Sequence, residues 1–105
     1  MGITINDLIS LNNLINIDYG DKTVFFKFGT DWCIPCSELD KILINIPNSI
    51  IYHISVDNEN FESYLMENKI YTIPYIIIKY SNKIKKIIGI HTQNQIEKYI
   101  EELKL

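Results

Sequence analysis

Apolar residues recur along the chain in two alternating patterns, one typical of buried strands and one with the spacing of helices. The segment Thr23–Phe28 carries β-branched and aromatic residues at both odd and even positions, so apolar side chains would point to both sides of a strand. This pattern predicts a central strand covered on both faces. After a short loop, apolar residues at i, i+3, i+4 and i+7 predict a helix from about Cys33 to Ile46, which Pro47 ends. The first recognisable unit is therefore a buried strand followed by an amphipathic helix.

The same alternation continues over the rest of the chain. At the N-terminus, a helix opened by a capping box of Thr4 and Asp7 competes with a short strand at Ile3–Ile5, and the pattern leaves both starts open. The later predicted elements are a strand at Ser49–Val56, a helix from Asp57 or Asn58 through Lys69, a hairpin of Tyr75–Tyr80 and Lys83–Ile90, and a final helix behind a Thr92–Gln95 capping box. This order predicts an α/β fold with a central mixed sheet of four to five strands and helices on both faces.

Size and charge narrow the classes of function. A chain of 105 residues has the size of one domain, so we expect residues 1–105 to form a single unit. Ten Lys and Arg against 13 Asp and Glu give a formal net charge of −3, which argues against a nucleic-acid partner. No apolar run approaches the roughly 18 residues of a membrane helix, and the first residues lack the pattern of a secretory signal. We therefore expect no membrane contact and a cytoplasmic location.

The two cysteines, Cys33 and Cys36, form a Cys-x-x-Cys pair at the start of the predicted helix. A disulfide that closes so short a loop adds little stability, so the pair is better suited to chemistry than to structure. At a helix N-terminus, free N–H groups and the helix dipole favour a thiolate on Cys33, while Cys36 lies one turn inward. This asymmetry suits a dithiol in which Cys33 attacks a disulfide and Cys36 resolves it. A zinc site is not predicted, because His53 and His91 lack paired spacing.

The segment Trp32-Cys33-Ile34-Pro35-Cys36 resembles the Trp-Cys-Gly-Pro-Cys active site of the thioredoxin family. Thr72-Ile73-Pro74 is similar to the family's cis-proline segment, and Gly89-Ile90 resembles the glycine segment that completes its substrate groove. The likeness covers nearly the whole chain and implies the thioredoxin fold. The substrate-binding residues that it implies are Trp32, Ile73, Pro74, Tyr75, Gly89 and Ile90.

Two departures from the family pattern lie next to the cysteines and the proline. Ile34 replaces the usual glycine inside the motif, so we expect it, with Pro35, to tune the redox potential and to enlarge the apolar rim. Tyr75 replaces the common threonine after the cis-proline, which predicts added bulk close to the groove.

A third departure concerns charge. Where the family usually keeps a buried carboxylate, six residues before the first cysteine, this chain has Lys27, and the family's partner lysine falls at His53. A buried cation favours a nearby thiolate and disfavours its own charge. We therefore hypothesise that neutral Lys27, His53 or water accepts the proton of Cys36. The alternatives are that Lys27 only extends to a sheet edge and that His53 is an ordinary core histidine.

The resemblance implies a thiol–disulfide oxidoreductase that reduces protein disulfides through a reversible Cys33–Cys36 disulfide, with roles in electron transport and cell redox homeostasis. It implies an NADPH-dependent thioredoxin reductase as partner, a monomeric state and no bound cofactor, since the chain has no phosphate-binding glycine motif. Two alternatives stay open. One is a thiol oxidant or isomerase, and the other is a binding module of the same fold without redox activity.

Overall fold

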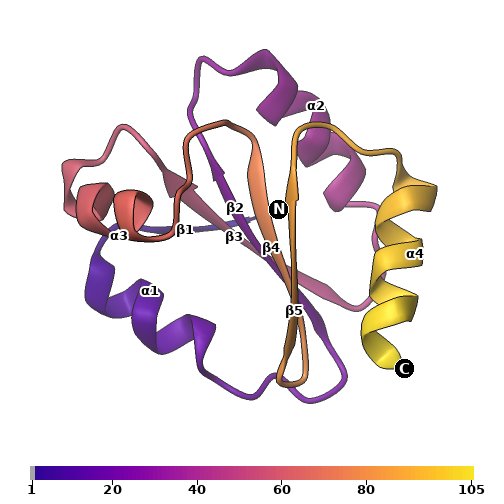
Figure 1. Ribbon diagram of the computed structural model, residues 1–105. Coiled ribbons are helices and arrows are strands. Elements are labelled where there is room, and N and C mark those ends of the chain that lie inside the picture. Colours follow the sequence, from indigo (N-terminus) through magenta and orange to yellow (C-terminus); the bar gives the residue numbers. More distant parts are fainter. Residues whose placement is uncertain (1) are drawn as a thin grey trace.

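The computed structural model describes residues 2–105 and builds them into one five-stranded sheet with helices on both faces (Figure 1). The strands are β1 (Ile3–Ile5), β2 (Thr23–Gly29), β3 (Ser49–Ser55), β4 (Tyr75–Tyr80) and β5 (Lys83–Ile88). The helices are α1 (Leu8–Ile15), α2 (Ile34–Leu43), the 3-10 turn η1 (Glu59–Phe61), α3 (Glu62–Glu67) and α4 (Gln93–Lys104). In this part of the chain, no helix has the length and apolar character needed to cross a membrane.

Strand β2 lies at the centre of the sheet, whose order is β1-β3-β2-β4-β5. It runs parallel to β3 and antiparallel to β4, while β4 and β5 form the predicted hairpin. All seven residues of β2 are buried, which confirms a central strand covered on both sides. The mixed sheet predicted from the element order is confirmed, with β1 as its fifth strand.

The two faces of the sheet carry separate cores because side chains alternate along β2. Phe26 and Phe28 pack with Leu11 and Phe61 on the face covered by α1 and α3. Phe25 lies on the opposite face, in the core formed with α2 and α4. Figure 1 shows these two pairs of helices on either side of the sheet. Both faces of β2 are therefore covered, so the strand lies between two packed layers of helices.

Several element boundaries differ from those expected, and the second hairpin strand ends at Ile88 rather than Ile90. Asp7 caps α1 through a hydrogen bond from the Ser10 N–H, and Thr4 belongs to β1, so the strand at the N-terminus forms and the proposed capping box does not. Helix α2 ends at Leu43, three residues early, and a looser turn leads to Pro47. The helix expected through Lys69 is shorter, because Asn58 caps η1 and α3 ends at Glu67.

Candidate active site

The two cysteines lie at the carboxyl end of β2, where a short loop leads into α2. They are joined by a disulfide, with Cα atoms 5.2 Å apart. Cys33 is the N-cap residue of α2, and its Sγ accepts a hydrogen bond of 3.2 Å from the N–H of Cys36. Cys33 is 6% exposed and Cys36 only 1%. The predicted asymmetry is present, because the outer sulfur lies at the helix N-terminus and the inner one is shielded.

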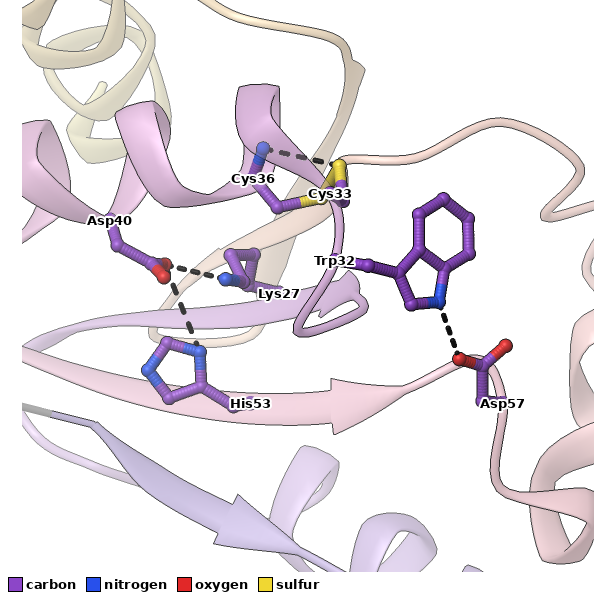
Figure 2. The surroundings of a disulfide bond; sticks show 7 residues. All are labelled: Lys27, Trp32, Cys33, Cys36, Asp40, His53 and Asp57. Carbon is purple, nitrogen blue, oxygen red and sulfur yellow. Dashed lines mark hydrogen bonds and ion pairs between the residues drawn. A yellow bond between two sulfur atoms is a disulfide. The ribbon is translucent and has the colours of Figure 1, made fainter.

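The residues between and before the cysteines face outward. Pro35 lies in the first turn of α2, where a missing N–H leaves no helix hydrogen bond unmade. Ile34 is 74% exposed and Trp32 70% exposed, so both offer apolar surface beside the disulfide. The Trp32 indole Nε1–H donates a 2.9 Å hydrogen bond to Asp57 Oδ2, which fixes the ring over the loop after β3 (Figure 2).

The proline segment and the glycine segment meet at the same end of the sheet. The Ile73–Pro74 peptide bond is cis, and the N–H of Gly89 donates a 2.8 Å hydrogen bond to the Pro74 carbonyl. Gly89 has φ of +84°, a conformation that suits glycine. Because β4 starts opposite the end of β2, this junction lies at the edge of the sheet that carries the cysteines. Ile90, which follows it, is exposed, and Ile73 is half-buried.

Tyr75 requires a correction. Its side chain is only 5% exposed and packs edge-on against Phe28, with ring centroids 5.9 Å apart. Burial raises the pKa of its phenol. Because strand β4 directs this side chain into the core below the sheet, Tyr75 adds no bulk to the exposed apolar surface.

A charged cluster lies on the inner side of the disulfide. Lys27, from the middle of β2, is 5% exposed, and its Nζ forms an ion pair of 2.5 Å with Asp40 Oδ1 of α2. His53 lies beside Lys27 in the β2–β3 register, and its Nδ1 is 3.8 Å from the same carboxylate oxygen. Figure 2 shows Lys27 and His53 converging on Asp40 beneath the helix, away from Trp32. Lys27 therefore does not extend to a sheet edge.

The ion pair changes the interpretation of the proton acceptor. An ammonium group in an ion pair has no lone pair with which to accept a proton. Burial lowers the pKa of His53, the Lys27 cation lowers it further, and Asp40 acts in the opposite direction. His53 is therefore uncharged at neutral pH. These charges leave His53, Asp40 or water as bases and argue against Lys27.

The inner side is also tightly packed at one point and open at another. A Cβ placed on Gly29 would lie 2.8 Å from Cys36 Sγ and 3.6 Å from Lys27 Cε, so only glycine leaves room for the sulfur. A cavity of about 320 Å³ lies alongside, lined largely by polar side chains that include Lys27, Thr30, Ser37, Asp40 and His53. Within residues 2–105, the buried Thr30 Oγ1 has no hydrogen-bond partner. The cavity gives the charged cluster a polar surrounding.

Sequence reasoning missed Asp40, Gly29 and Asp57 as site residues. Asp40 follows Cys36 by four residues, a spacing that places both on one side of a helix, and this was the signal available for it. Within residues 2–105, no group of three or more His, Cys, Asp or Glu side chains is arranged to hold a metal ion.

Comparison with known proteins places the chain in a family. The sequence profile of the thioredoxin family matches residues 11–102. Similar solved structures include chloroplastic thioredoxin z (20% identity, TM-score 0.80, covering 98% of this chain and 94% of that one). The fold is shared by mitochondrial thioredoxin 3 of Saccharomyces cerevisiae, with 21% identity, a TM-score of 0.73 and coverage of 97% of this chain and 95% of that one. It is also shared by the thioredoxin of Trypanosoma brucei brucei, with 16% identity, a TM-score of 0.77 and coverage of 99% of this chain and 91% of that one. No curated protein sequence matches significantly. The chain therefore belongs to the thioredoxin family and is a thiol–disulfide oxidoreductase.

Proposed function

We propose that the protein is a reductase of protein disulfides, with Cys33 as the nucleophile and Cys36 as the resolving thiol. The Cys33 thiolate attacks one sulfur of a substrate disulfide, whose other sulfur leaves as a thiolate. Cys36 then loses its proton and attacks Cys33 Sγ, which closes the Cys33–Cys36 disulfide and releases the second substrate thiolate. The substrate gains two electrons, the dithiol loses two, and the two protons given up by the cysteines balance the two substrate thiolates.

One observation carries this assignment of roles. The N–H of Cys36 donates to Cys33 Sγ at the N-terminus of α2, and the same donor would stabilise a thiolate on Cys33 once the disulfide is reduced. Cys36 is almost fully buried and can only react with a sulfur already brought to it. The exposed side chains of Trp32, Ile34 and Ile90 support an apolar contact surface for the substrate chain.

The proposal extends to partners and setting. The reducing equivalents lie in the two sulfur atoms, so the chain needs no bound cofactor, and an NADPH-dependent thioredoxin reductase regenerates the dithiol. We expect the protein to act as a monomer in the cytoplasm, where a reducing thiol pool keeps such a pair reduced. Ile34 and Pro35 tune its potential, and the segments around Pro74 and Gly89 bind the substrate backbone.

The direct test is reduction of a model protein disulfide in the presence of NADPH and a thioredoxin reductase. The rate of NADPH consumption measures the reaction. The native chain should reduce the substrate, and Cys33→Ser/Cys36→Ser should be inactive. Cys36→Ser alone should accumulate a mixed disulfide with the substrate, whereas Cys33→Ser should not. A native chain that reduces no disulfide, even when its own disulfide has been opened chemically, contradicts the proposal.

A redox titration against glutathione separates a reductant from an oxidant. We expect a potential of about −270 mV, the value of a thioredoxin-like reductant. A value between about −180 and −120 mV would instead support an oxidant or isomerase. A binding module without redox activity would keep its partner when both cysteines are replaced by serine.

A further inference from the structure

The inner charged cluster has no role in the steps written above, although it lies against the resolving cysteine. Cys36 Sγ and Lys27 Cε both lie within 4 Å of the position that a Gly29 Cβ would occupy, so the lysine side chain and the sulfur come close to each other beside Gly29. Asp40 follows Cys36 by one helical turn, and its carboxylate holds the Lys27 ammonium. A cation and an anion in contact with each other are thus fixed on the inner side of one buried thiol.

Resting on the proposed function, we propose that Lys27 and Asp40 are positioning residues that together set the pH at which Cys36 resolves the mixed disulfide. The Lys27 ammonium favours the Cys36 thiolate, because an opposite charge in a buried setting stabilises the ionised form. Asp40 anchors the ammonium and offsets part of its field. Strand β2 supplies the cation and helix α2 supplies the anion. The family resemblance implied instead a carboxylate on the strand, at the position of Lys27.

Other charged groups near Cys36 are accounted for. His53 of β3 lies beside Lys27, with its Nδ1 3.8 Å from the same carboxylate oxygen, and Asp31 lines the cavity from the loop after β2. His53 is uncharged at neutral pH, because burial and the Lys27 cation lower its pKa. The cavity is lined by these groups and by Gly29 and Ser37, which lie next to Cys36. At neutral pH the charges within the inner cluster are therefore those of the Lys27 ammonium and the Asp40 carboxylate.

The test follows the two steps of the reaction separately in the reduced protein. Dithiobis(nitrobenzoate) releases one coloured thiolate when Cys33 attacks and a second when Cys36 closes the disulfide, and the pH dependence of each release gives a midpoint. In Lys27→Met the second midpoint should rise by about one pH unit, at the lower end of the effect of a nearby opposite charge. In Asp40→Asn it should fall by a smaller amount, because the field of Lys27 is no longer offset.

Shifts of the second midpoint in opposite directions in the two variants indicate electrostatic control. A merely structural role would shift this midpoint in the same direction in both variants, or in neither. The double variant Lys27→Met/Asp40→Asn, with both charges removed, should return towards the native midpoint, and it remains informative if Lys27→Met alone folds poorly. Glu38→Gln makes the same charge change on an exposed turn of the same helix and should move neither release. Unchanged second midpoints in an active protein overturn this inference alone. A native chain that releases no coloured thiolate overturns the proposed function instead.

Discussion

The outer side of the Cys33–Cys36 disulfide is apolar and exposed, whereas its inner side is charged and buried or half-buried. Trp32 and Ile34, on the outer side, are each at least 70% exposed and are neighbours of Cys33 in the sequence. The inner side is assembled from Lys27 of β2 and Asp40 of α2, which lie thirteen positions apart, with His53 of β3 beside them. The outer side is thus local in sequence and the inner side is tertiary.

This difference has a consequence for how the two sides tolerate change. An exposed residue such as Ile34 makes few contacts and can be replaced singly at small cost. A buried charge must keep its partner, since removing one member of a pair leaves the other uncompensated. Lys27 is therefore compatible with this fold because Asp40 stands opposite it on α2. The inner side is expected to change in pairs and the outer side residue by residue.

The largest effect on stability is expected from Gly29→Ala, on the inner side. The added methyl group would meet Cys36 Sγ at 2.8 Å and Cys36 Cβ at 3.3 Å, which requires the start of α2 to shift. Overpacking of this kind costs about 1–3 kcal/mol of the free energy of unfolding. Urea denaturation of the reduced protein measures it.

A double-mutant cycle with Cys36→Ala, also in reducing conditions, identifies the cause. If the sulfur is the obstacle, the loss in Gly29→Ala/Cys36→Ala should be smaller than the sum of the two single losses. Strictly additive losses would mean that the inner side has spare room at this point, and the contrast in packing between the two sides would be wrong.

On the outer side, Asp57→Ala should have a smaller effect. It removes the acceptor of the Trp32 indole N–H, an exposed hydrogen bond whose net contribution we estimate at about 0.5–1 kcal/mol. Trp32 is the single tryptophan of the chain, so its fluorescence reports directly on the change in its surroundings. Asp57→Asn keeps an oxygen acceptor and should retain most of the native signal. A loss above that of Gly29→Ala would reverse the ranking of the two sides.

Much of the fold was predictable because local patterns determine it. The fully buried β2, the β4–β5 hairpin and the Thr92–Gln95 capping box each depend on residues close together in the chain, and all three are confirmed. The position of Cys33 as a helix N-cap follows in the same way from Pro35 and the preceding strand. Boundaries were less predictable, since α2 ends at Leu43, several residues before Pro47.

The inner side could be predicted only in part. The sequence placed Lys27 and His53 in neighbouring strands, and the β2–β3 register does pair them. Asp40 was not found, because a carboxylate among Glu38 and Lys41 on a predicted helix has the pattern of a solvated face. Its role depends on how α2 crosses the sheet, which no local pattern contains. For the same reason the side chain of Tyr75 was expected at the surface and lies in the core.

The smallest expected effect concerns the response of stability to acid. Because the pKa of His53 is lowered in the folded protein, the unfolded chain binds more protons once the pH falls below about 6.5, the ordinary value for histidine. The native chain should therefore lose stability as the pH falls from neutral through that range, and His53→Gln, which cannot titrate, should lose less. Urea midpoints between neutral and mildly acidic pH measure the two slopes, with His91→Gln as the matched control outside the cluster. Equal slopes for the native chain and His53→Gln would show that the Lys27 cation and burial do not hold His53 uncharged, and the contrast in charge between the two sides would then rest on the Lys27–Asp40 pair alone.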